Sequence, residues 1–262
     1  MDVVRQVLSD AQRYSRLRMR HRLAALPDCE VSHAESLDGD GFVADGGESL
    51  MIRVVITKRG ARVRVDFTGT SPTARGPVNA PLPVTASSVY YTLIGLAGGD
   101  IQPNSGAYSV AEIVAPAGSL VHAVYPAAVV AANTETSNRI VDVLLGALAK
   151  ASPDRVPAGS YSSACVVSFG GHDPARGRTF VHYETVGGGM GGLAAFLPHP
   201  QGEAPRVLAS KSGPHRLNRG DVLEIRTAGG GGWGSPAWDS EVRVNDSRSG
   251  LSLVNAENGG NG

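Results

Sequence analysis

The sequence has few cysteines, few aromatic residues, no excess of charge and no long apolar run. Its 24 Lys and Arg balance 24 Asp and Glu, which leaves no overall basic charge to attract nucleic acid or an anionic membrane. No apolar run reaches the roughly 18 residues of a membrane-spanning helix. The first residues are charged, which argues against a secretory signal peptide. We therefore expect a cytoplasmic protein with no nucleic-acid or membrane partner.

Two cysteines are present, Cys29 and Cys165, and they form no Cys-x-x-Cys pair. This usage favours reduced thiols over a disulfide, and the apolar neighbours of Cys165 indicate a buried, unreactive side chain. Glycine is abundant at 34 residues, whereas aromatic residues make up 5%. Many backbone positions are therefore expected to adopt conformations that a side chain would disfavour. The length of 262 residues is sufficient for a substantial buried core.

Apolar spacing predicts three helices. In residues 2–26, Val4, Val7 and Leu8 recur at intervals of three and four residues, and Pro27 ends the helix. The same periodicity predicts helices over residues 83–97 and 135–150. Thr134 is expected to be the N-cap of the last helix, because its hydroxyl can accept a hydrogen bond from a free backbone amide.

Alternation of apolar and polar residues predicts the strands. The expected elements are a hairpin of residues 49–57 with 61–68, a strand pair of 161–170 with 178–186 joined through 170–174, and strands at 110–115, 205–210 and 221–227. Residues 28–48 are expected to be loop with at most one short strand. The predicted fold is α+β, with mostly antiparallel sheets packed against two or three helices. Residues 1–240 would form one domain, in one or two lobes, and residues 241–262 a flexible tail.

Polar residues crowd the start of the last predicted helix, in the run Asn133-Thr134-Glu135-Thr136-Ser137. Two interpretations remain open. Capping of the helix accounts for most of these side chains. Alternatively, Glu135 faces a subunit interface or a substrate channel.

His182 and Glu184 are expected on one face of a strand, a spacing that can present two metal ligands. A protein metal site needs three or four ligands, and no neighbouring motif supplies the others. A structural pair is therefore favoured over a metal site. The remaining histidines, His33 and His122 among them, are expected on the surface or in loops.

Two glycine-rich segments, residues 187–192 and 228–234, each follow a predicted strand. Neither contains the Lys-Ser/Thr that completes a phosphate-binding loop, so close backbone packing or an interface loop is favoured over nucleotide binding. The serines at 160, 162 and 163 lie in no Gly-x-Ser-x-Gly motif, which argues against a serine hydrolase.

Four motifs occur in a fixed order along the chain. They are residues 66–81 (Asp-Phe-Thr-Gly-Thr-Ser-Pro and Arg-Gly-Pro-Val-Asn-Ala-Pro), 133–137, 183–189 (Tyr-Glu-Thr-Val-Gly-Gly-Gly) and 228–234. In this succession the sequence resembles the hydantoinase B family, which includes subunits of ATP-dependent hydantoinases, oxoprolinases and ketone carboxylases. Relative to that family, the chain looks like a shortened C-terminal half.

The resemblance implies a subunit of a multi-chain enzyme that acts on an amide or carbonyl substrate. A hydantoinase A-like subunit and an N-terminal hydantoinase B-like chain are the expected partners. ATP and a divalent metal are expected on these partners, and no cofactor or metal is expected on this chain alone. A stand-alone enzyme is disfavoured, because no complete set of acid, base, nucleophile or metal ligands can be drawn. The alternative is a non-catalytic assembly or regulatory subunit.

The resemblance also implies which residues lie near the active site. The expected catalytic residues are Glu135 and Glu184. The residues expected to contact the substrate or a subunit interface are Asn133, Thr134, Thr136, Thr185, Gly187, Gly188 and Gly189.

Overall fold

The computed structural model describes residues 2–42, 49–98 and 100–186, and the short segments 194–197, 206–208, 215–216 and 223–226. These residues all belong to one compact unit, Met1–Gly232. The predicted glycine loops at 187–192 and 228–234 and the predicted tail at 241–262 lie outside the described residues. The domain boundary at residue 240 therefore stays a prediction.

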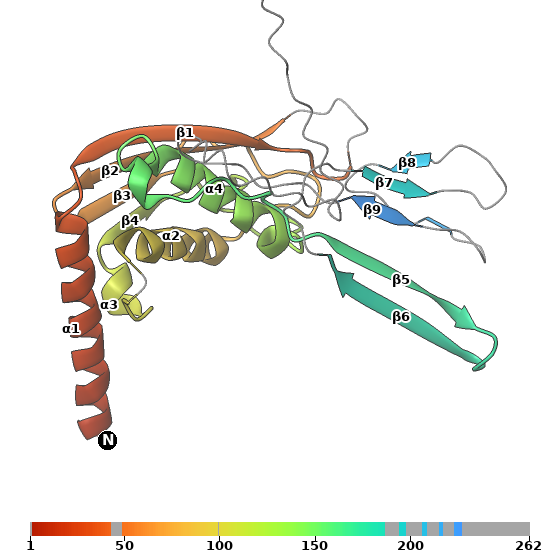
Figure 1. The fold of residues 1–262 in the computed structure, drawn as a ribbon, viewed down its shortest axis with the longest axis horizontal. Helices are drawn as coiled ribbons and strands as arrows, with labels where there is room; N and C mark the ends of the chain where they lie inside the picture. The colour runs from red at the N-terminus through yellow and green to blue at the C-terminus, as the bar shows by residue number, and fades with distance from the viewer. Residues whose placement is uncertain are drawn as a thin grey trace, which may run out of the picture. The chain divides into compact units, whose positions relative to one another are not determined.

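A four-stranded sheet forms the centre of the fold (Figure 1). Its strands, in spatial order, are β1 (Cys29–Leu37), β2 (Leu50–Arg59), β3 (Arg62–Asp66) and β4 (Ala111–Val114). The pairs β1–β2 and β2–β3 are antiparallel, whereas β4 joins β3 in parallel. The parallel pairing follows from the long connection between β3 and β4, which contains two helices.

Four α-helices pack with this sheet in the described residues. They are α1 (Asp2–Ala24), α2 (Leu82–Ala97), α3 (Ser105–Tyr108) and α4 (Ser137–Leu148). The helix α4 contacts β1 and β2, α2 contacts α4, and α1 contacts α3 (Figure 1). A π-helical turn, η1 (Ala132–Thr136), leads into α4, and a 3-10 turn, η2 (Pro153–Arg155), follows it. None of the described helices is both long and apolar enough to cross a membrane.

Strict alternation along β2 and β3 separates a buried face from an exposed face. Ile52, Val54 and Ile56 of β2 are at most 1% exposed, and β3 adds Val63 and Val65 to the same core. The buried face meets the apolar side of α4, which carries Ile140, Val143 and Leu144. Each buried aliphatic side chain contributes roughly 1.5–3 kcal/mol to folding. The opposite face carries four arginines, Arg53 and Arg59 of β2 and Arg62 and Arg64 of β3.

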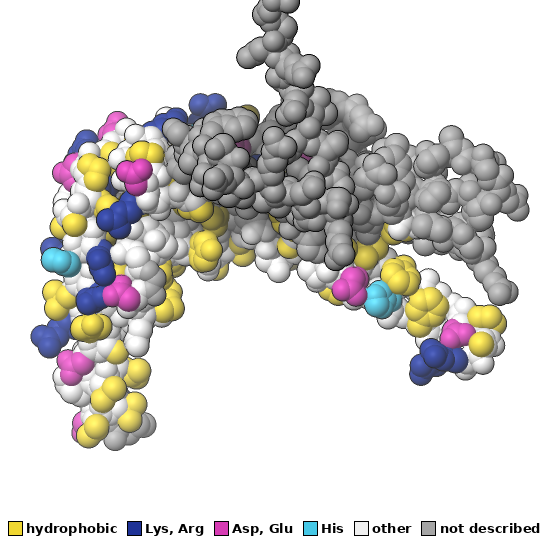
Figure 2. Space-filling view, viewed as in Figure 1, with side chains coloured by type: hydrophobic (Ala, Val, Ile, Leu, Met, Phe, Trp, Pro, Cys, Tyr) yellow, Lys and Arg dark blue, Asp and Glu magenta, His cyan; other side chains and the backbone are white. Residues whose placement is uncertain are grey.

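A two-stranded antiparallel hairpin, β5 (Val166–Asp173) and β6 (Arg178–Thr185), follows α4 in sequence. All eight side chains of β6 are exposed, and Figure 2 shows hydrophobic, histidine and acidic side chains open to view along the hairpin. Three short strands, β7 (Ala194–Leu197), β8 (Arg206–Leu208) and β9 (Glu224–Arg226), form a separate sheet in the order β8-β7-β9.

The predicted α+β class, with mostly antiparallel sheets and three long helices, is confirmed. Residues 28–48 do contain one strand, as the prediction allowed, but β1 is longer than the short strand expected, because it has nine residues. The predicted turn at 170–174 is wrong. The strand β5 continues through these residues to Asp173, and the chain reverses at 174–177, where Gly177 adopts a positive φ of 60°.

The expected N-cap role of Thr134 is contradicted by the structure. The helical path begins earlier, at Ala132, and Thr134 lies inside the π-helical turn. Its hydroxyl donates a hydrogen bond back to the carbonyl of Ala131 at 3.4 Å instead of accepting one from a free amide. The backbone amide of Ser137 bonds to the carbonyl of Ala132, the five-residue spacing of a π-turn.

Candidate functional site

Polar side chains gather where the start of α4 meets β1 and residues 159–165. Glu135, Arg139 and Asp142 follow one another at four- and three-residue intervals, which places them on one side of the helix. We call this group the α4 cluster. Its members are Glu135, Arg139 and Asp142, His33 and Glu35 of β1, and Ser160, Ser162 and Ser163.

Glu35 is the charged centre of the part of the cluster that faces β1. Its carboxylate accepts hydrogen bonds from Arg139 Nη1 at 2.8 Å and lies 3.0 Å from His33 Nε2. Burial alone would raise the pKa of Glu35, but the bonds to Arg139 and His33 outweigh it and hold the pKa below its ordinary value. The carboxylate is therefore ionised at neutral pH. The expectation that His33 lies on the surface or in a loop is wrong, because His33 is half-buried in β1.

The pKa of Asp142 is shifted in the opposite direction to that of Glu35. It is 8% exposed, and its carboxylate accepts hydrogen bonds from the hydroxyls of Ser160, at 3.1 Å, and Ser162. Burial raises the pKa of Asp142, and the negative charge of Glu35 raises it further. The hydrogen bonds from Ser160 lower the pKa but do not cancel this increase. Two carboxylates with pKa values moved apart in this way can divide the roles of proton donor and proton acceptor.

Ser162 holds a strained backbone conformation beside Asp142. Its φ of 56° lies in the left-handed region, which costs a non-glycine residue roughly 1–2 kcal/mol. The side chain is 3% exposed, and the backbone amide donates to Ser160 Oγ at 3.0 Å. Hydrogen bonds to Asp142 and Ser160 thus offset the strain and fix the path of the chain before β5.

Glu135 connects the first turn of the helix to the segment before β5. Ser163 Oγ donates to Glu135 Oε1 at 2.8 Å, and the amide of Ala164 donates to the carbonyl of Thr134, also at 2.8 Å. The amide of Val186 in turn donates to the carbonyl of Cys165 at 2.9 Å. The structure therefore brings two of the motifs, near residues 135 and 185, onto the same short segment of chain.

The other predicted site residues lie at different places relative to this contact between Glu135 and the segment before β5. In the β5–β6 register, Thr185 pairs with Val166 and Glu184 with Val167, just beyond the segment that bonds to Glu135. Asn133 is exposed beside this junction. Thr136 is fully buried and donates its hydroxyl to the carbonyl of Val78, which is a packing role. Gly187, Gly188 and Gly189 lie outside the described residues.

His182 and Glu184 do lie on one face of β6, with Nε2 and Oε2 3.3 Å apart and both side chains about half exposed. Two potential ligands are fewer than a protein metal site takes. In the part of the chain that the structure describes, no group of three or more His, Cys, Asp or Glu side chains is placed to hold a metal ion. These residues alone therefore do not fit a metal centre.

The two cysteines are free thiols, as predicted. The expectation that Cys165 is buried in a strand is wrong, because it precedes β5 and is partly exposed. Its Sγ lies 3.7 Å from Ser163 Oγ, next to the junction with Glu135.

Sequence reasoning missed the roles of Glu35, Arg139 and Asp142. A signal for Asp142 was present, because it is an acidic residue in the apolar run Ile140-Val141-Asp142-Val143-Leu144. A charge on the buried side of a helix requires polar partners. The sequence did not indicate that Ser160 and Ser162 supply them.

Comparison with known proteins places the chain in a family. Residues 1–202 match the sequence model of the family Hydantoinase B/oxoprolinase. The chain is 35% identical over 167 residues to 5-oxoprolinase 1 of Arabidopsis thaliana, an alignment that covers 63% of this chain and 12% of that protein. It is 32% identical over 200 residues to a putative D-/L-hydantoinase subunit of a Pseudomonas species, covering 73% of this chain and 33% of that protein.

A solved structure with a similar fold is the ATP-dependent caprolactamase from Pseudomonas jessenii. The TM-score is 0.58 at 24% sequence identity, over 79% of this chain and 34% of that chain. The chain thus spans about a third or less of the length of each of these relatives. The family match extends over most of the sequence, including the α4 cluster, and the chain belongs to the hydantoinase B/oxoprolinase family.

Proposed function

We propose that this protein is a subunit of a multi-chain enzyme of the hydantoinase, oxoprolinase or ketone carboxylase type. In this proposal, a hydantoinase A-like subunit uses ATP to activate an amide or carbonyl substrate. An N-terminal hydantoinase B-like chain supplies the divalent metal. This chain contributes the α4 cluster and the adjoining end of β6 to the interface near the active site.

The observation that carries the proposal is the family match over residues 1–202, which includes both polar motifs. The relatives named above are an oxoprolinase, a hydantoinase subunit and a caprolactamase, all named for cyclic amides. The hydrogen bond from Ser163 to Glu135 adds geometric support, because it brings motifs some 50 residues apart in sequence to one place.

Glu135 and Glu184 are the carboxylates assigned to this site. Glu135 is half-buried and held by Ser163, so its position is defined before any partner binds. Glu184 is 59% exposed and can reach a partner chain. The neighbouring side chains of Asn133, Thr134 and Thr185 offer hydrogen-bonding groups for a polar substrate or for the partner's backbone.

The experiment is to express this chain alone and together with the two proposed partner chains. ATP hydrolysis and ring opening of 5-oxoproline, hydantoin and caprolactam are then measured, along with ATP-dependent fixation of bicarbonate onto a ketone. Activity is expected only when the three chains are combined. Turnover by the isolated chain would overturn the assignment to a multi-chain enzyme.

Substitutions separate a catalytic subunit from a scaffold. Glu135→Gln and Glu184→Gln remove a charge with little change in shape, and each should lower the rate of the assembled complex by about tenfold or more. Glu30→Gln is the matched control, because Glu30 is 64% exposed on β1 and lies outside the cluster. Unchanged rates for both site variants in an intact complex would favour the non-catalytic assembly role instead.

A further inference from the structure

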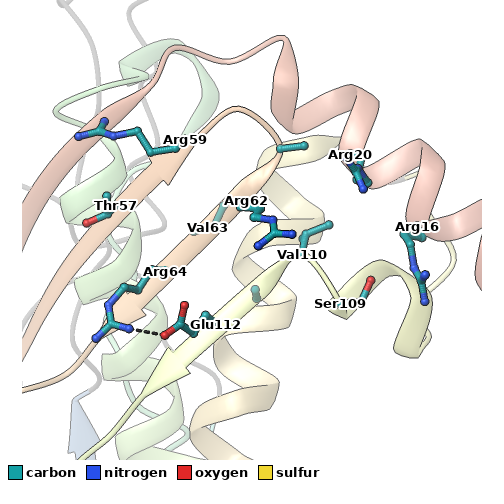
Figure 3. Close-up of a pocket in the computed structure, with 12 residues that line it drawn as sticks. Arg16, Arg20, Thr57, Arg59, Arg62, Val63, Arg64, Ser109, Val110 and Glu112 are labelled. Carbon is teal, nitrogen blue, oxygen red and sulfur yellow. Dashed lines mark hydrogen bonds and ion pairs between the residues drawn. The ribbon is translucent and has the colours of Figure 1, made fainter.

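A groove of about 520 Å³ lies where α1 meets the exposed face of β2, β3 and β4 (Figure 3). Figure 3 shows arginines lining it from α1 and from β3, whereas the side chain of Arg59, on β2, is directed away from Arg62. We call it the arginine groove. Its charged lining consists of Arg16, Arg20, Arg59, Arg62, Arg64 and Glu112.

The positive charges of the arginine groove are only partly neutralised. Arg64 is paired with Glu112 and, at 3.0 Å, with Asp66. Arg59 lies 3.9 Å from Glu30, but both of these side chains are more than 60% exposed, which makes the pair weak. Arg16, Arg20 and Arg62 have no ion pair within the described residues. Three cations thus face a common space without a counter-charge from the described chain.

The register of the hairpin makes this arrangement unfavourable for the isolated protein. Arg59 and Arg62 are directly opposite each other in the β2–β3 pairing. Like charges at opposed positions destabilise a sheet, because their side chains are close neighbours on one face. An anionic partner that pairs with either guanidinium group would reduce this repulsion and gain a charge-assisted hydrogen-bonded pair.

The spacing of the arginines indicates the shape of that partner. Arg62 and Arg64 alternate along β3, which places them about 6.6 Å apart on the same face. Arg16 and Arg20 are separated by about one turn of α1, or roughly 6 Å. An extended polypeptide presents every second side chain at the same interval of about 6.6 Å. Carboxylates at alternate positions therefore match Arg16 and Arg20 along α1. On the strand wall they match Arg62, because Arg64 already has Asp66 and Glu112 as partners.

We propose that the arginine groove binds an extended acidic segment of a partner protein that has Asp or Glu at alternate positions. A guanidinium group fits a carboxylate through two parallel hydrogen bonds, which favours this pairing. Single-stranded nucleic acid has a similar charge spacing but binds through base stacking on aromatic side chains, and the groove lining contains no aromatic residue. The groove volume of about 520 Å³ also exceeds what a single phosphate would occupy.

The test is fluorescence anisotropy with the full chain and a labelled synthetic peptide that alternates glutamate and serine. The peptide should bind, and its affinity should fall as the ionic strength is raised, because exposed ion pairs are screened by salt. A peptide of the same composition with all its glutamates contiguous should bind more weakly, because neighbouring side chains of an extended chain point in opposite directions. Equal affinity for both peptides would overturn the proposed spacing.

Charge reversal locates the binding site. Arg62→Glu and Arg20→Glu should each weaken binding by roughly tenfold or more, the factor that corresponds to about 1.4 kcal/mol. Arg53→Glu is the matched control, because Arg53 lies on the same face of β2 but outside the groove. Arg62→Glu also places a carboxylate opposite Arg59, so its melting temperature should be no lower than that of the parent chain. Loss of binding would therefore not reflect unfolding.

Competition experiments distinguish the other occupants. Inorganic phosphate, ATP and a single-stranded oligonucleotide are added to the bound peptide at matched ionic strength. Weak or no displacement supports an acidic polypeptide, whereas displacement by phosphate or ATP would reassign the groove to a small anion. Tighter binding of the oligonucleotide than of the peptide, or self-association of the chain that Arg62→Glu abolishes, would also overturn the proposal. Peptide binding is measurable whether or not the α4 cluster takes part in catalysis.

Discussion

Replacing Gly146 by alanine is expected to destabilise the protein, although this substitution stabilises most helices. Gly146 lies in α4 and faces His33 of β1. A Cβ atom at this position would lie 2.6 Å from His33 Nε2, closer than non-bonded atoms can approach. The imidazole cannot move away without loss, because the same nitrogen is hydrogen-bonded to Glu35 at 3.0 Å.

The expected change in the free energy of unfolding of Gly146→Ala is the sum of opposing effects. Alanine is favoured over glycine in a helix by about 0.8–1.0 kcal/mol. Overpacking of a well-filled contact costs about 1–3 kcal/mol. A hydrogen bond to a charged group contributes about 1.5–3 kcal/mol, and the lower end applies here because both side chains are 30% exposed. The net loss is roughly 1.5–3.5 kcal/mol, and a domain of this size loses roughly 2–4 °C in Tm per kcal/mol.

Thermal and urea denaturation of the full chain provide the measurement, with Gly95→Ala as the matched control. Gly95 is an exposed glycine of α2, and a Cβ there would meet nothing within 4 Å, so that variant should gain up to about 1 kcal/mol. Adding His33→Ala to Gly146→Ala removes the obstacle, and the double variant should be more stable than the sum of the two single changes predicts. If Gly146→Ala stabilises the protein as much as Gly95→Ala, the close contact between α4 and β1 is wrong.

Three further substitutions test buried contacts elsewhere in the fold. Burial holds the pKa of Asp142 above 3.8, so the folded state favours the protonated carboxyl and loses stability as pH rises through that pKa. The side chain introduced by Asp142→Asn cannot ionise, so the free energy of unfolding of this variant should rise relative to that of the parent as the pH goes from acidic to neutral, measured by urea titration. A stability difference that becomes smaller over this pH range would contradict a raised pKa. Asn79→Ala removes a fully buried amide that bonds to the backbone of Ala74, Gly76 and Ala128, and the free energy of unfolding should fall by roughly 2–4 kcal/mol in the same assay. In Gly106→Ala, the new Cβ would lie 2.6 Å from the backbone carbonyl carbon of Gln12 in α1, and calorimetry should record a loss of about 1–3 kcal/mol; no change would show that α1 and α3 are farther apart.

Elements with strong periodicity could be predicted from the sequence. The β2–β3 hairpin alternates apolar and polar residues throughout, and α4 repeats apolar residues at helical spacing, so both were predicted near their observed positions. The strand β1 was predicted as a short strand at most, because its run, Cys-Glu-Val-Ser-His-Ala-Glu-Ser-Leu, has only three aliphatic side chains. It is a strand because β2 pairs with it along its whole length and α4 packs against it, and neither contact is visible in the local sequence.

The candidate site was predictable only in part. Glu135 was recognised from its motif, and His182 and Glu184 were correctly placed on one face of a strand. The partners of Asp142 could not be predicted, because they come from a loop some 20 residues later that folds back on the helix. Periodicity describes single elements, whereas this contact depends on the path of an irregular segment with a positive φ at Ser162.

The helix α4 is attached to β1 near both of its ends, through Arg139 to Glu35 and through Lys150, just past the last turn, to the carbonyl of Ser32. A slide of one helical turn, about 5.4 Å, would break both attachments at once. These two polar contacts add to the register that the interdigitated apolar side chains already favour. The turn that carries Glu135 is therefore held in a fixed position relative to the sheet. The Glu135 carboxylate would keep that position when another chain binds.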